Sequence, residues 1–92
     1  MKINIVQTLT FQRQIKKLHK NQKQDLDKAI SLILKDTNIG DMKKGDLDGV
    51  RVYKFSMVNQ LTLLAYEFFE DQLQLQLLML ASHENFYRNL KR

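Results

Sequence analysis

The sequence predicts an α+β domain in which a helical hairpin packs on a small, mainly antiparallel sheet. Three observations predict it: two early segments carry apolar residues at helical spacing, three later segments carry them at strand spacing, and short turn signals separate the strands. The predicted element order is β-α-α-β-β-β-α. The 92 residues suffice for a single domain over 1–92.

The first half of the chain is predicted to hold one strand, over 2–6, and two helices. Thr8 or Thr10 caps the first helix, because a threonine hydroxyl accepts hydrogen bonds from the backbone of the first helical turn. Asn21 separates that helix from a second one, predicted over about 22–36. The two apolar stripes have helical spacing: Phe11, Ile15 and Leu18, then Leu26, Ala29, Ile30, Ile33 and Leu34.

The second half is predicted to form a three-stranded antiparallel meander followed by a short helix. The strands are expected at 50–57, 61–69 and 73–81. Turns at 58–60 and 70–72 join them, and Ser82 is expected to cap a final helix over 83–90. The helical hairpin then covers one face of the sheet and leaves the opposite face partly open.

Positive charge is concentrated in the first half of the chain. The formal net charge is +5. Residues 1–40 hold eight Lys or Arg against three acidic residues, whereas residues 41–92 hold seven of each sign. Such a field attracts nucleic acid or an acidic protein partner. A solvated, Lys-rich helical face explains the same charge without any partner.

The composition excludes several kinds of chemistry. The chain has no Cys, so disulfides, thiolate nucleophiles and cysteine zinc sites are excluded. Its two histidines, His19 and His83, lie far apart in sequence, so neither a metal site nor a cofactor is expected. The first residues contain no long apolar run, so we expect no signal peptide, no membrane span and a cytoplasmic protein.

The element order and three stretches, KKGDLDGVRVYKF, LTLLAY and LASHENFYRNLKR, carry a resemblance over essentially the whole chain. The sequence resembles the RelE/ParE superfamily of type II toxin–antitoxin toxins, which divides into ribosome-dependent toxins that cleave mRNA and toxins that poison DNA gyrase. GDLDGVRVYKF and ASHENFYRNL are most similar to a ParE-like branch. The His-x-x-x-Tyr ending is similar to what RNA-cleaving members place at their active site.

The resemblance implies a growth-arresting toxin that pairs with a cognate antitoxin from an adjacent gene in a hetero-oligomer. We expect the antitoxin to wrap the apolar edges of the helical hairpin and sheet. The apolar runs 61–69 and 73–80 are expected to offer it a sheet edge or groove.

The RNA-cleaving members of the superfamily use the ribose 2′-OH as nucleophile and need no metal. Such a site requires a base near the 2′-OH, cations at the phosphate and an acid for the leaving 5′-oxygen. His83 is the natural proton carrier, because histidine titrates near neutral pH. Tyr87, at i+4, shares a helix face with it and relays a proton or stacks on a base. Arg51 and Arg88 clamp the phosphate, since a guanidinium contacts two oxygens.

Structural explanations of the same residues stay open. His83 is also explained as a first-turn helix residue that donates to a nearby carbonyl, and Tyr87 as an edge residue of an amphipathic helix. The cations of the last turn, Arg88, Lys91 and Arg92, favour the helix dipole without any ligand.

The cations predicted to bind nucleic acid are Lys16, Lys17, Lys20, Lys54, Arg88, Lys91 and Arg92. On the strand over 50–57, Arg51, Tyr53 and Phe55 share one face and Lys54 takes the other. Tyr53 and Phe55 either stack bases on the open sheet face or pack against the sheet.

The target is left open between RNA and DNA gyrase. RNA-cleaving members often carry a further Arg on the strand corresponding to 61–66, where this chain has Thr62 and no cation. His83 with Tyr87 favours an endoribonuclease that cleaves mRNA. The alternatives are a ParE-like gyrase inhibitor and, less favoured, a DNA-nicking toxin.

Overall fold

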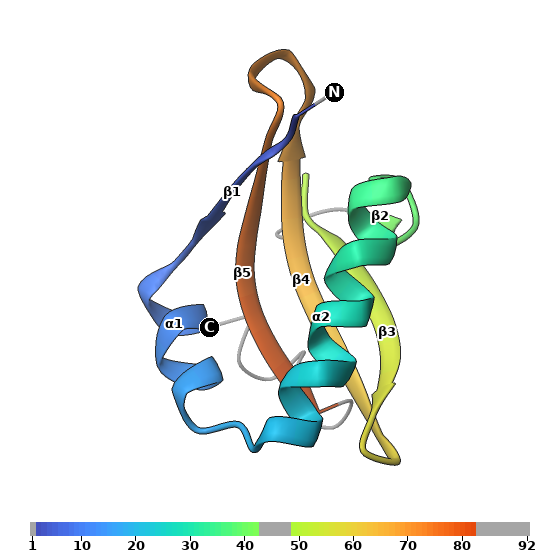
Figure 1. Ribbon diagram of the computed structural model, residues 1–92. Helices are drawn as coiled ribbons and strands as arrows, with labels where there is room; N and C mark the ends of the chain where they lie inside the picture. The colour runs from blue at the N-terminus through green and yellow to red at the C-terminus, as the bar shows by residue number, and fades with distance from the viewer. Residues whose placement is uncertain (1, 43–48, 83–92) are drawn as a thin grey trace.

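The computed structural model describes residues 2–42 and 49–82, which form a five-stranded sheet with two helices on one face (Figure 1). In chain order the elements are β1 (Asn4–Gln7), α1 (Leu9–Lys16), α2 (Lys20–Lys35), β2 (Asp41–Met42), β3 (Arg51–Met57), β4 (Gln60–Phe69), the 3-10 turn η2 (Glu70–Gln72) and β5 (Gln74–Ser82). The predicted α+β class is confirmed.

The sheet order is β1-β5-β4-β3-β2. The meander of β3, β4 and β5 is antiparallel, as predicted, and β1 pairs with β5 in parallel. Two features were not predicted: that parallel pairing and the short edge strand β2, which pairs with the start of β3. Because β4 has a neighbour on both sides, its apolar run 61–69 is a central strand and not the exposed edge that the sequence suggested for an antitoxin.

Capping residues decide where the two helices begin. The Thr8 hydroxyl accepts a hydrogen bond from the Phe11 N–H at 3.1 Å, so Thr8 rather than Thr10 caps α1. The backbone N–H of His19 donates to the Gln22 side-chain oxygen at 2.7 Å, so α2 begins at Lys20, earlier than predicted. Asn21 therefore lies inside the first turn of α2 and is not a break.

The main core lies between the helices and the sheet. Its buried members are Phe11, Leu26, Ile33, Met57, Leu64, Tyr66, Leu75, Leu77 and Leu80. Tyr53 and Phe55 pack against this core with their rings stacked, the centroids 6.1 Å apart. These two rings therefore lie under the helices, which contradicts the prediction that they stack bases on an open face and supports the packing alternative.

The face opposite the helices is closed at its centre. Val52, Leu63 and Ala65 are at most 2% exposed and form a second buried cluster, against which Val50, Leu78, Met79 and Ala81 pack. The expectation of a partly open face is therefore wrong at this position. Burial on both faces explains why the sequence of β4 is apolar without alternation.

A polar clasp holds the segment that follows α2 against the sheet. The Tyr66 hydroxyl, fully buried, donates to the Thr37 carbonyl at 2.8 Å and accepts from the Gly40 N–H at 3.0 Å. The Arg51 guanidinium donates to the carbonyls of Gly40 at 2.9 Å and Asn38 at 3.4 Å. The contacts with Thr37 and Gly40 satisfy backbone groups that burial would otherwise leave unpaired.

Replacing Tyr66 by Phe is expected to remove a fall in stability at high pH. Burial raises the pKa of the Tyr66 phenol above its ordinary value of 10.0, against partial opposition from the Gly40 N–H and Arg51. The unfolded chain therefore loses the phenol proton first, and the free energy of unfolding falls as pH rises above about 10. At neutral pH the variant loses about 1–2 kcal/mol, because the partners of the hydroxyl lose a hydrogen bond.

Urea unfolding at several pH values measures both effects. Tyr53→Phe is the control, and it is expected to keep the decline above pH 10 that Tyr66→Phe abolishes. An equal decline in wild type and Tyr66→Phe would contradict this account.

The turn between β3 and β4 holds a β-branched residue in a left-handed conformation. Val58 and Asn59 have φ angles of +50° and +66°, which are the signs of a type I′ hairpin turn. Val is unfavourable there, because its branched Cβ crowds the backbone. The Asp25 carboxylate accepts from the Val58 N–H at 2.8 Å and ties the turn to α2.

Replacing Val58 by Asn is expected to raise the free energy of unfolding by about 1 kcal/mol, because Asn tolerates the left-handed region. The side chain of Val58 is 42% exposed, so little packing is lost. Leu61→Asn is the control, since Leu61 is similarly exposed at the same end of the hairpin but lies in β4. Equal shifts of the denaturation midpoint in both variants would show that the turn conformation is not the cause.

Candidate functional site

The candidate site lies at the end of the sheet where β5 finishes. Ser82 is the last residue of β5 and pairs with Thr62, so the structure places it in a strand. The predicted helix 83–90 lies outside the described residues. Figure 1 shows that the α1–α2 connection and the β3–β4 turn reach the same end of the sheet.

Lys54 stands in one cross-strand row with this end of β5. It pairs with Leu63, and Leu63 pairs with Ala81. Two interstrand spacings put the Cα atoms of Lys54 and Ala81 about 10 Å apart. Lys54 is exposed and lies on the sheet face opposite the helices, as its alternation with Arg51 predicted. The exposed Lys54 side chain therefore lies in the row of paired residues next to the one that contains Ser82.

Arg51 lies at a different place in the sheet. It pairs with Tyr66, four residues along β4 from Thr62, which places its Cα about 17 Å from that of Ser82. Its guanidinium is bound to the Gly40 and Asn38 carbonyls in the polar clasp. The structure thus gives Arg51 a role in the fold and does not bring it together with the end of β5.

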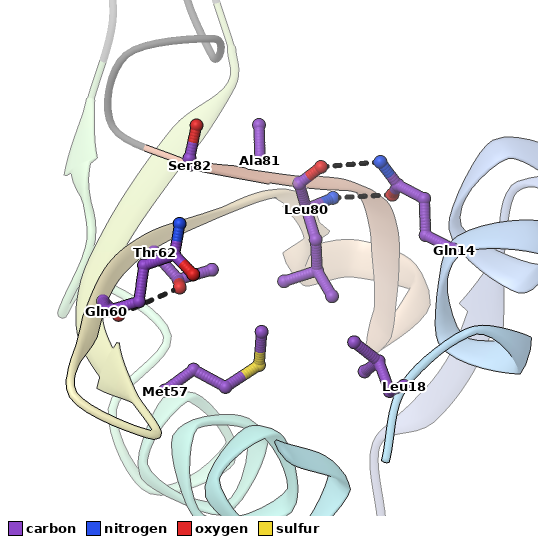
Figure 2. Close-up of a pocket in the computed structure, with 8 residues that line it drawn as sticks. All are labelled: Gln14, Leu18, Met57, Gln60, Thr62, Leu80, Ala81 and Ser82. Atoms are coloured by element: carbon purple, nitrogen blue, oxygen red, sulfur yellow. Dashed lines mark hydrogen bonds between the residues drawn. The ribbon is translucent and has the colours of Figure 1, made fainter.

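A cavity of about 200 Å³ opens beside Ser82 on the helix side of the sheet (Figure 2). Its lining combines apolar and polar side chains: Gln14, Leu18, Met57, Gln60, Thr62, Leu80, Ala81 and Ser82. Thr62 is buried and donates to the Gln60 carbonyl at 3.0 Å. The Gln14 side chain binds the backbone of Leu80, a contact that no periodicity in the sequence signals.

The predicted nucleic-acid-binding residues divide into two groups. Lys16, Lys17 and Lys20 are exposed around the α1–α2 connection, and Leu18 of that connection lines the cavity beside Ser82. Arg88, Lys91 and Arg92 lie outside the described residues, and so do the predicted catalytic residues His83 and Tyr87. Lys16, Lys17 and Lys20 therefore belong to the helix layer, whereas Lys54 lies on the opposite face of the sheet.

Within residues 2–42 and 49–82, no group of three or more His, Asp or Glu side chains is placed to hold a metal ion. The helices in this part of the chain are also too short or too polar to cross a membrane.

The fold is similar to that of solved E. coli RelE structures. The free E. coli RelE toxin, as a double arginine-to-alanine mutant, is 17% identical, with a TM-score of 0.71 and 100% of this chain and 98% of that chain covered. A chain of the intact E. coli RelBE toxin–antitoxin complex is 14% identical, with a TM-score of 0.70 and 88% of this chain and 96% of that chain covered. The same mutant RelE in complex with an antitoxin peptide is 15% identical, at a TM-score of 0.70 and coverage of 100% and 98%.

A model of the ParE-like toxin of type II bacterial toxin–antitoxin systems matches residues 5–91. The chain therefore belongs to this toxin family. A search of curated proteins finds no significant match.

Proposed function

We propose that this toxin arrests growth as a metal-independent endoribonuclease that cleaves mRNA on the ribosome. The observation that carries the proposal is the register that sets the exposed Lys54 in one row with Leu63 and Ala81, next to the start of SHENFYRNLKR. The Lys54 side chain is long enough to contact the phosphate of an RNA that binds beside residue 82. The likeness of the fold to RelE supports the same function.

The proposed reaction transfers two protons around one phosphate. The ribose 2′-OH attacks the adjacent phosphorus as a base accepts its proton, and the bond to the 5′-oxygen breaks as an acid protonates that oxygen. His83 is proposed as base or acid, and Tyr87 as the proton relay or a stacking group. Lys54 and Arg88 balance the negative charge on the phosphate oxygens. Arg51 stays a predicted phosphate ligand, but the polar clasp makes it the weaker candidate.

The Lys-rich connection between the helices is proposed to bind ribosomal RNA. Lys16, Lys17 and Lys20 are exposed and close in sequence, with no acidic residue between them. Contacts of this kind are largely electrostatic and weaken as salt rises. Lys91 and Arg92 are proposed to add to the same positive field.

An antitoxin is the proposed protein partner. The E. coli RelE structures include a RelBE complex and a complex with an antitoxin peptide. On this chain the outer sides of β1, α1 and α2 expose Ile5 at 40%, Leu9 at 67% and Leu32 at 43%. Exposed aliphatic side chains on the helices are suited to an apolar antitoxin segment. A cytoplasmic location follows from ribosomal mRNA as the target.

The second candidate function is inhibition of DNA gyrase without catalysis. The ParE-like family match favours it, as does the absence of a cation from 61–66 in β4. Under this function, toxicity depends on surface patches of the helices and not on one proton-transfer residue.

One experiment separates the two functions. The chain is induced without an antitoxin, and messenger decay and chromosome integrity are followed in the same culture. Rapid loss of messenger with intact DNA, abolished by His83→Ala, is expected. Stable messenger with double-strand breaks would replace the endoribonuclease with the gyrase inhibitor, and nicked DNA without gyrase dependence would indicate a DNA-cutting toxin.

A further inference from the structure

The last third of β5 is displaced by a β-bulge. Ala65 pairs with Met79, but the next residue of β4, Tyr66, pairs with Leu77, so Leu78 is an extra residue in β5. A bulge of this kind bends its strand and reverses the alternation of faces beyond it. The faces on which Leu80, Ala81 and Ser82 lie are therefore set by the bulge, and so is the direction in which β5 ends.

β1 does not accompany β5 past the bulge. Its last paired residue, Gln7, stands opposite Leu77. Beyond Leu77, the side chains of Thr8 and Gln14 make the hydrogen bonds to the β5 backbone that a neighbouring strand would otherwise make. The Thr8 hydroxyl donates to the carbonyl of the bulged Leu78 at 2.6 Å. The Gln14 amide donates to the Leu80 carbonyl at 2.5 Å and accepts from the Leu80 N–H at 2.7 Å, as Figure 2 shows.

The Gln14 contact reproduces a strand pairing with one side chain. A carboxamide carries one donor and one acceptor side by side, which match the N–H and carbonyl of one residue at a strand edge. Glu lacks the donor, and Ala lacks both groups. Since Gln14 and Leu80 are 66 positions apart in sequence, the contact ties helix α1 to the end of β5.

We infer that Gln14 is a positioning residue for the proposed RNA cleavage. It holds the register of β5 past the bulge and thereby sets the position of Ser82, the residue that precedes the proposed proton carrier His83 in sequence. The inference rests on the proposed function. A displacement of about 1 Å at a reacting group costs up to about 100-fold in rate, so a loose strand end slows catalysis without touching the RNA.

The test compares four full-length proteins: wild type, Gln14→Ala, Gln14→Glu and the control Gln12→Ala. Gln12 lies on the same helix, is exposed, and donates to the Gln7 carbonyl at 3.2 Å. Two quantities are measured at a temperature where circular dichroism shows every variant folded. The first is hydrogen exchange of the Leu80 amide, and the second is kcat and KM for cleavage of a ribosome-bound messenger.

Both Gln14 variants are expected to exchange the Leu80 amide at least about 10-fold faster, because the contact that protects it is weakened or lost. Their kcat falls about 100-fold, while KM stays within about 3-fold, because binding of the messenger is left to other residues. Gln12→Ala behaves as wild type. Should Gln14→Ala fail to fold, Gln14→Glu, which keeps the acceptor for the Leu80 N–H, carries the test.

Faster Leu80 exchange with a wild-type kcat would overturn the inference, and so would unchanged exchange in the Gln14 variants. If wild type itself cleaves no messenger, the proposed function fails separately. Growth arrest is then measured in place of kcat. Arrest by Gln14→Ala at the wild-type level would overturn the positioning role. Loss of arrest in Gln14→Ala but not in Gln12→Ala would support it.

Discussion

Replacing Lys54 by Ala is expected to slow messenger cleavage by about 100-fold, because the phosphate loses a cation where negative charge develops. The side chain is exposed on a sheet face, and the described part of the chain forms no hydrogen bond with it. The free energy of unfolding is therefore expected to change by less than about 0.5 kcal/mol. A variant that is as stable as wild type but inactive would show that Lys54 acts in cleavage and not in folding.

The matched control is Lys28→Ala, an exposed lysine on α2. It removes the same charge from the chain, so any general electrostatic effect on RNA binding appears equally in both variants. Cleavage of a ribosome-bound messenger by purified protein measures the rates. Equal rates for the two variants would exclude Lys54 from the site.

A third variant, Arg51→Ala, distinguishes the two basic residues of β3. Its guanidinium holds the segment after α2 through the Gly40 and Asn38 carbonyls. We expect it to lower the midpoint of thermal unfolding where Lys54→Ala does not. A stable and inactive Arg51→Ala would instead restore Arg51 to the catalytic site.

Replacing Gly40 by Ala is expected to lower the free energy of unfolding by about 3 kcal/mol, at the upper end of the range for overpacked cores. A Cβ at this position would stand 2.9 Å from both Cε1 and the hydroxyl oxygen of Tyr66, and 3.1 Å from the backbone carbon of Val52. Tyr66 and Val52 are at most 2% exposed, so neither has room to move. Displacing the ring also breaks the hydrogen bonds at its hydroxyl.

A double-mutant cycle tests whether the clash with Tyr66 is the cause. Tyr66→Leu removes the ring and its hydroxyl, so Gly40→Ala is expected to cost much less in that background than in wild type. The free energies come from urea unfolding of the four proteins. Additive costs would show that the ring is not what excludes a side chain at residue 40.

The amino-acid sequence by itself determined the class of fold and the kind of each main element. Helical spacing marks α1 and α2, and apolar strands separated by turns mark β3, β4 and β5, because these periods are properties of neighbouring residues. Thr8 was recognised as one of two helix caps for the same local reason. The family also followed from sequence, since its motifs lie within short stretches of the chain.

Only the tertiary structure decided which residues meet. The parallel pairing of β1 with β5 and the contact of Gln14 with Leu80 join residues about 70 positions apart, and no local pattern encodes them. The bulge at Leu78 shifts the register between β4 and β5, and no local pattern marks it either. From the sequence, Arg51 was predicted to bind the phosphate at the catalytic site and Lys54 only to bind nucleic acid. Register places Lys54 in the row of the end of β5 and Arg51 beside the segment after α2, whose Gly40 and Asn38 carbonyls it binds. The pairing of strands is a property of the whole folded chain.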